Sequence, residues 1–166
     1  MAQDFSFDIE CQFDLQKLKN ALEQTKREIQ SRYDFKNVTA EVDLSENNSL
    51  IITTESDYKI QAIKEILHSK LVKQDQSPKI LDWSKVPEKA SGMNIRQHIP
   101  LIKALSSEQS KQIQKLIKES GEKVKANIQG ETIRISSPSK NSLQSIIQLL
   151  KDHKDIDIPL QFVNFR

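Results

Sequence analysis

Hydrophobic and polar positions alternate at strand spacing or recur at helix spacing, in one order that occurs twice along the 166 residues. In the first half this pattern predicts a strand, a helix, two strands, a helix and a short strand, at residues 5–12, 15–29, 38–44, 50–54, 60–71 and 79–83. In the second half it predicts the same six elements at residues 93–101, 106–117, 123–129, 132–136, 139–150 and 159–165.

The two halves also match residue by residue. The stretch Val38–Val42 aligns with Val124–Ile128, and Leu50 and Ile52 align with Ile133 and Ile135. Shared order and shared residues together indicate an internal duplication. Each half then reads βαββαβ, and its two helices are expected to cover one face of a sheet and leave the other face open.

The predicted fold is therefore α+β, with two ferredoxin-like domains. We expect a first unit over residues 1–84, a connector over 85–92 that contains Pro87 and Gly92, and a second unit over 93–166.

The composition says more about the cellular compartment in which the protein is expected than about its function. The formal net charge is only +2, so electrostatics do not force a nucleic-acid partner. The single cysteine, Cys11, cannot form an internal disulfide, which fits a reducing compartment. The start of the chain has no apolar run of a signal peptide, and no stretch approaches the ~20 apolar residues of a membrane span. We expect a cytoplasmic protein without a membrane partner.

The sequence lacks the residue spacings of common catalytic and metal-binding motifs. The three glycines are too widely spaced for a phosphate-binding loop, and the three histidines lie on separate predicted elements without metal-ligand spacing. We therefore expect no catalytic residue, no metal and no cofactor, and no enzyme activity. An acyl-phosphate hydrolase is suggested by the fold alone, and the loop 11–14 offers neither the glycine nor the arginine that this chemistry needs.

The hairpin 123–136 is the clearest basic feature. Its polar face is expected to carry Lys123, Lys125, Asn127, Gln129 and Arg134. RNA-recognition sheets bind bases through aromatic residues on their central strands, and this hairpin has none. The face is therefore expected to hold phosphates without stacking bases. The alternative is that it is only the hydrated side of an ordinary hairpin.

Two stretches, 31–37 and 160–166, place basic residues beside aromatic rings. In the first, Arg32 and Lys36 lie next to Tyr33 and Phe35. An arginine beside a ring could grip a phosphate while the ring stacks on a base. The alternative is structural: the first stretch would be a helix exit with Phe35 in the core, and the second a closing strand.

The blocks Arg32-Tyr-Asp-Phe-Lys-Asn37, Ile128-Gln-Gly130 with Arg134, and Pro159–Arg166 closely resemble the YajQ family of bacterial proteins. The resemblance covers nearly the whole chain. It implies two ferredoxin-like halves that exchange their first strands, so that residues 5–12 join the second sheet and residues 93–101 join the first.

The resemblance also implies a function. The family is described as nucleotide-binding, with tRNA, GTP or ATP, or cyclic di-GMP proposed as ligands, and as acting in regulation through protein partners. The chain is thus expected to be a non-enzymatic nucleotide- or RNA-binding protein. The alternative is a protein–protein interaction module that binds no nucleotide.

Ten residues are candidates for nucleotide contact, from the family blocks and the basic hairpin face. They are Arg32, Asp34, Phe35, Lys36, Lys123, Lys125, Gln129, Arg134, Phe162 and Arg166. The sequence departs from the usual family pattern at Arg96-Gln97-His98 and at 139–144, where two acids that usually begin the last helix are absent. Their absence makes that helix start less repellent to anions.

Overall fold

The computed structural model describes residues 4–46 and 49–166. The chain divides into two compact units, of which one is a continuous stretch of the sequence and the other combines two segments. The α1–α2 unit is Phe13–Ile102. The α3–α4 unit combines the residues up to Gln12 with Lys103–Arg166.

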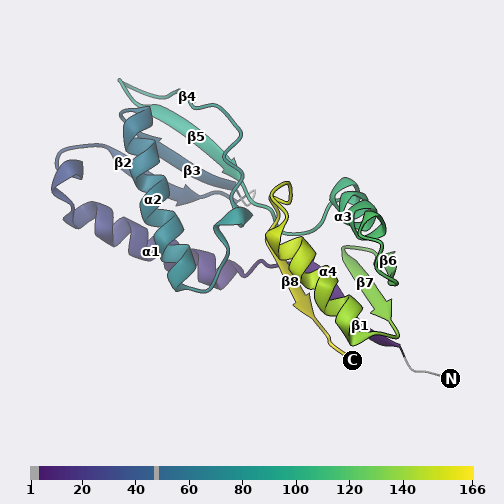
Figure 1. Cartoon of the computed structure of the whole chain (residues 1–166). Helices are drawn as coiled ribbons and strands as arrows, with labels where there is room; N and C mark the ends of the chain where they lie inside the picture. Colours follow the sequence, from purple (N-terminus) through teal and green to yellow (C-terminus); the bar gives the residue numbers. More distant parts are fainter. Residues whose placement is uncertain (1–3, 47–48) are drawn as a thin grey trace. The chain divides into compact units, whose positions relative to one another are not determined.

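The α1–α2 unit places two helices on one face of an antiparallel sheet with strand order β2-β3-β5-β4 (Figure 1). Its helices and strands are α1 (Leu15–Ser31), β2 (Ala40–Leu44), β3 (Ser49–Thr54), α2 (Asp57–Lys73), β4 (Glu88–Lys89) and β5 (Ile95–Pro100). Two short 3₁₀ helices, Tyr33–Phe35 and Pro78–Ile80, follow α1 and α2.

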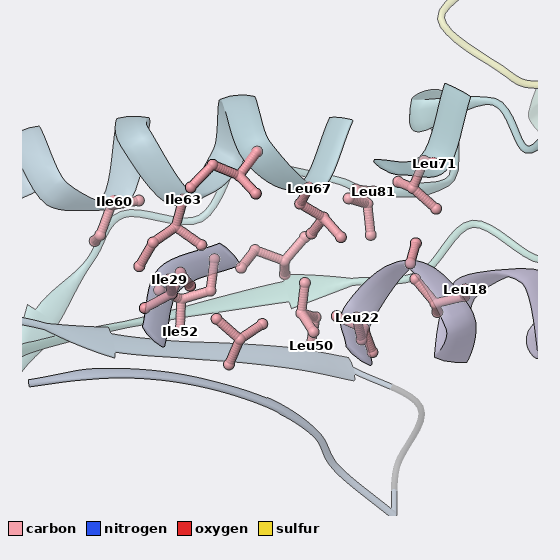
Figure 2. Close-up of a cluster of buried hydrophobic side chains, with 14 of the residues drawn as sticks. Leu18, Leu22, Ile29, Leu50, Ile52, Ile60, Ile63, Leu67, Leu71 and Leu81 are labelled. Carbon is pink, nitrogen blue, oxygen red and sulfur yellow. The ribbon is translucent and has the colours of Figure 1, made fainter. Parts of the chain in front are cut away.

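Side-chain caps fix where the two helices of this unit begin. The Asp14 carboxylate accepts hydrogen bonds from the backbone N–H groups of Gln16 and Lys17, and the Ser56 hydroxyl accepts one from Lys59. These caps satisfy N–H groups that have no partner within the helix. The helices then bury their apolar faces on the sheet (Figure 2). Each buried aliphatic side chain contributes about 1.5–3 kcal/mol. The labelled members of this core are Leu18, Leu22, Ile29, Leu50, Ile52, Ile60, Ile63, Leu67, Leu71 and Leu81.

The α3–α4 unit has an antiparallel sheet with strand order β6-β7-β1-β8. Its elements are β1 (Phe5–Cys11), α3 (Ser107–Glu119), β6 (Lys125–Gln129), β7 (Thr132–Ser137), α4 (Lys140–Asp152) and β8 (Leu160–Val163). Ser106 and Gln109 form a reciprocal capping box at the start of α3. Phe7 and Ile9 of β1 lie opposite Ile135 and Ile133 of β7, and all four side chains are buried.

The first strands of the two halves are exchanged. β1 pairs with β7 and β8, whereas β5 pairs with β3 and β4. Each therefore occupies the position beside the third strand that the first strand of a βαββαβ unit takes. The predicted α+β class with two ferredoxin-like halves is confirmed.

Several predicted element bounds were wrong. Residues 79–83 form no strand, because Pro78–Ile80 is a 3₁₀ helix and only Leu81 makes an isolated bridge, to Leu101. The fourth strand of this sheet, Glu88–Lys89, lies instead within the predicted connector. The last strand ends at Val163, so Phe165 lies beyond it.

The basic hairpin is shorter than predicted. β6 begins at Lys125, which leaves Lys123 outside the strand. The two strands of the hairpin pair as expected, with Asn127 opposite Arg134 and Gln129 opposite Thr132.

Candidate functional site

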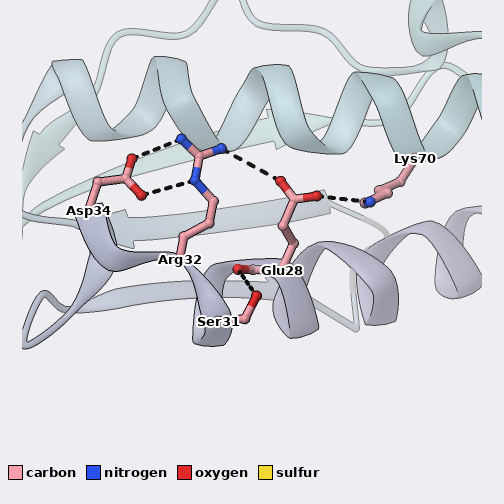
Figure 3. Close-up of polar contacts among 5 residues, drawn as sticks. All are labelled: Glu28, Ser31, Arg32, Asp34 and Lys70. Atoms are coloured by element: carbon pink, nitrogen blue, oxygen red, sulfur yellow. Dashed lines mark hydrogen bonds and ion pairs between the residues drawn. The ribbon is translucent and has the colours of Figure 1, made fainter.

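The aromatic–basic block after α1 is held together by its own charges (Figure 3). Arg32 donates from Nε and Nη2 to the two carboxylate oxygens of Asp34, at 2.9 and 2.8 Å. Its Nη1 lies 3.6 Å from Glu28, which in turn pairs with Lys70 at 3.0 Å. The hydrogen bonds from Arg32 hold the pKa of Asp34 below its usual value, and the hydrogen bond from Lys70 lowers the pKa of Glu28.

Phe35 lies beneath this charged network. Its ring is buried in the α1–α2 core, with the Arg32 guanidinium 5.7 Å and the Lys59 ammonium 4.9 Å from the ring centroid. Lys59 also donates to the backbone carbonyl of Asp34. A phosphate at Arg32 would have to displace the Asp34 carboxylate, and no base can stack on a buried ring. The contacts favour the structural interpretation for Arg32, Asp34 and Phe35, whereas Lys36 and the ring of Tyr33 are exposed beside them.

The helix-free face of the β6-β7-β1-β8 sheet is polar, and its central cation is already paired. Arg134 of β7 donates from Nε to Asp8 of β1 at 3.0 Å, and Asn164 donates to the other oxygen of the same carboxylate at 2.9 Å. Asp8 is only 7% exposed, and the hydrogen bond from Arg134 is the main reason that its pKa is lowered. Lys125 and Gln129 remain exposed on this face.

This pairing limits what the sheet face can bind. The face combines the Arg134–Asp8 pair with a second polar contact, from the Gln161 amide to Glu10 at 2.7 Å. Phe5 and Phe7 alternate with Asp8 and so belong to the opposite face. A ligand on the helix-free face would meet Lys125, which has no ion-pair partner among the described residues, and Arg166, whose charge also acts on Asp8.

A hollow of about 350 Å³ lies beside the first turns of α4 and is lined by residues of α4, of β1 and of the segment after β8. Besides Ser6, it is lined by Phe5, Lys140, Leu143, Gln144, Phe165 and Arg166. The Lys140 ammonium lies 4.8 Å from the centroid of the Phe5 ring. Phe165 rests on the buried Phe7 ring with centroids 5.6 Å apart and an interplanar angle of 29°, yet it is 60% exposed.

A bulge at the end of β8 places Phe165 and Arg166. Val163 lies opposite Asp8, but the next paired residues are Ser6 and Arg166, whose backbones exchange hydrogen bonds of 3.2 and 3.0 Å. Two residues, Asn164 and Phe165, therefore oppose Phe7 alone. Asn164 adopts a positive φ of 57°, a conformation that asparagine tolerates better than most residues.

A second hollow, of about 560 Å³, lies between α3 and the edge strand β6. Lys111, Lys115 and Lys118 line it from the helix, and Gln114 donates to the backbone carbonyl of Ala126 at 2.8 Å. In residues 4–46 and 49–166, none of these lysines has an ion-pair partner. Glu122 also lines this hollow, so its surface is mainly cationic, and none of the lining residues is aromatic.

Comparison with known proteins identifies the family. The family model described as "Nucleotide-binding protein YajQ-like" matches residues 5–166. The chain belongs to the YajQ-like family. It is 44% identical to a nucleotide-binding protein of Synechococcus sp. (strain CC9605), 45% to one of Nostoc punctiforme and 40% to one of Desulfitobacterium hafniense. Each match covers 100% of both chains.

In this YajQ-like protein the ten predicted site residues lie in both compact units. Arg32, Asp34, Phe35 and Lys36 lie in the α1–α2 unit, and the other six lie in the α3–α4 unit. Of those six, only Arg166 lines the hollow at α4. Phe162 instead packs edge-on against Phe7, with centroids 5.8 Å apart.

Six of the seven residues that line this hollow were not among the sequence candidates, and they include Phe5, Lys140 and Phe165. Two sequence signals pointed there: the stretch 160–166, which places a basic residue beside aromatic rings, and the missing acids at the start of α4. The structure has no acidic residue in the first turn of α4. Within the described ranges, no helix is long and apolar enough to cross a bilayer.

Proposed function

We propose that the protein binds nucleotides and does not transform them. The observation that carries this proposal is the family match over residues 5–166, together with full-length relatives that are named nucleotide-binding proteins. The cysteine content fits action in the cytoplasm.

The charge distribution of the α3–α4 unit supports an anionic ligand. Lysines without an ion-pair partner among the described residues lie on α3, on β6 and at the start of α4. Phosphate groups are the part of a nucleotide that such cations attract. No Asp, Glu, His or Cys side chain lines the hollow at α4, so the side chains that most often activate a nucleophile as general base are not among its lining residues.

The candidate ligands are GTP, ATP, cyclic di-GMP and tRNA, and a regulatory role would follow if the ligand changed binding of a protein partner. The test is a titration of the whole chain with each ligand at low and at high salt. We expect saturable binding of at least one ligand and weaker binding at high salt, since phosphate contacts are screened. If none of the four binds at low salt, the proposal is wrong.

A second candidate is an interaction module that docks a protein on the helix-free face of the β6-β7-β1-β8 sheet. The Arg134–Asp8 pair favours it, because this pair leaves the face mixed in charge. The substitution Lys125→Glu separates the two functions. An unchanged nucleotide affinity would leave this face free for a protein partner, whereas a lost nucleotide affinity would place the ligand there.

A further inference from the structure

We propose that the hollow at the start of α4 binds one nucleotide unit, with its base stacked on Phe165 and its phosphates held by Lys140. This inference rests on the proposed nucleotide binding and assigns it to one site. The hollow is lined within the α3–α4 unit by residues from β1, α4 and the segment after β8.

Phe165 has the features of a base-stacking platform. One face of its ring is supported by the buried Phe7, while the residue as a whole remains 60% exposed. The bulge at Asn164 and the paired backbone bonds between Ser6 and Arg166 fix the segment that carries the ring. A ring that is already held in place loses little conformational freedom when a base stacks on it.

Lys140 provides the charge that the phosphates need, and it forms no ion pair with another residue in the parts of the chain that the structure describes. Arg166 also borders the hollow, but it lies opposite Ser6, on the face of Asp8, and its charge helps to lower the pKa of Asp8. The Lys140 ammonium rests over the Phe5 ring, a weak interaction that it can exchange for a phosphate contact. The first turn of α4 adds no acidic side chain to repel the ligand. Gln144 lines the same hollow and can both donate to and accept from a base edge.

The two other cationic surfaces of the α3–α4 unit lack one half of this chemistry. The α3 hollow has three lysines and no aromatic ring, and the helix-free sheet face has Arg134 already bound to Asp8. Phosphates alone would suit either surface, but a base would not. The volume of about 350 Å³ lies near the lower end of the range for small-molecule sites, which favours one nucleotide unit over two.

The experiment measures the affinity of the whole chain for GTP, cyclic di-GMP and inorganic triphosphate by calorimetry. We expect Phe165→Ala to weaken GTP binding about 5- to 150-fold, the range for loss of one base–aromatic stack. We expect Lys140→Ala to weaken both GTP and triphosphate about five- to tenfold. Phe165→Ala should leave triphosphate binding unchanged, because that probe has no base.

Matched controls separate the site from general effects. Lys151 also lies on α4 over a phenylalanine ring, that of Phe162, so Lys151→Ala should leave GTP affinity unchanged. Tyr58 is an exposed ring in the other unit, and Tyr58→Ala should also have no effect. Phe165→Tyr keeps the platform and should retain binding, and circular dichroism checks that each variant is folded.

Two negative results have different meanings. If wild type binds GTP or cyclic di-GMP but Phe165→Ala and Lys140→Ala bind as well as wild type, the assigned site is wrong and nucleotide binding stands. In that case Lys115→Glu and Lys125→Glu test the two other cationic surfaces. If the wild-type chain binds neither GTP nor cyclic di-GMP, this inference is wrong, and so is the proposal that the protein binds these two nucleotides.

Discussion

Phe7 and Gln97 occupy equivalent positions in the two sheets. Replacing each residue by the other tests why each of the two exchanged strands fits its own sheet. Phe7 lies opposite Ile135, and Gln97 lies opposite Ile52, which is the residue that aligns with Ile135 in the duplicated hairpins. Phe7 is 0% exposed and packs against the rings of Phe162 and Phe165.

Gln97 is also buried, at 6% exposure, but its environment is polar. Its amide donates to the backbone carbonyls of Lys85 at 2.8 Å and Trp83 at 3.4 Å. These bonds tie β5 to the segment that leads into β4. A phenylalanine at this position would leave both carbonyls without the amide and would overfill the space.

The substitution Phe7→Gln should therefore strongly destabilise the α3–α4 unit. Removing a buried phenylalanine ring costs about 3–5 kcal/mol. An amide without partners at this position adds about 1–3 kcal/mol. The sum of about 4–8 kcal/mol is comparable to the ~5–15 kcal/mol that stabilises a typical domain. The reciprocal change, Gln97→Phe, should cost about 2–4 kcal/mol, from overpacking and lost hydrogen bonds.

The assay can follow each unit separately in urea. The single tryptophan, Trp83, lies in the α1–α2 unit, so its fluorescence reports that unit, while far-UV circular dichroism reports all helices. Phe7→Gln should give an early transition by circular dichroism, and Gln97→Phe should move the Trp83 transition. If the free energy of unfolding of Phe7→Gln lay within about 1 kcal/mol of the wild-type value, the reasoning would be refuted, because the buried position of Phe7 would then tolerate an amide.

Two further predictions concern titratable groups of β1. Because folding lowers the pKa of Asp8 below 3.8, its carboxylate stabilises the folded state above about pH 4, and this contribution is lost as pH falls through the folded pKa. Asp8→Asn should thus cost about 1–2 kcal/mol at pH 7, allowing for the exposure of Arg134, and the difference from wild type in urea titrations should shrink toward pH 2. Burial, with help from the charge of Glu10, raises the pKa of the Cys11 thiol to about 11. At pH 8 iodoacetamide should therefore alkylate Cys11 roughly 100-fold more slowly in the folded chain than in urea, and equal rates would contradict this.

The periodic elements could be predicted because each has one buried face. Helices and hairpins showed their apolar sides in the spacing of residues such as Leu18, Ile63 and Ile133, which are all buried. β4 could not be found in this way, because Glu88 and Lys89 are both exposed and carry no pattern. The strand exchange is also invisible to periodicity, since β1 and β5 alternate in the same way in either sheet. Only the family resemblance predicted it.

The hollow at the start of α4 could not be predicted from the sequence, for a different reason. Phe5, Lys140 and Phe165 are far apart along the chain, and topology alone brings them together. The sequence did indicate a cation and a ring near Arg166, but it could not show that Phe162 faces the core while Phe165 is displaced outward by the bulge. The block around Arg32 was the more conspicuous motif. The ion pairs that Arg32 forms with Asp34 and Glu28 explain why charged residues occur together there.

The exchange of first strands has a consequence for the order of synthesis on the ribosome. The α1–α2 unit is complete once Ile102 has emerged, whereas β1 is made first and its neighbour β8 is made last. At ordinary elongation rates β1 waits roughly 8 to 30 seconds for that neighbour. During this interval Phe7 and Ile9 remain without their native cover, so the nascent amino-terminal segment is where a holding chaperone is expected to bind.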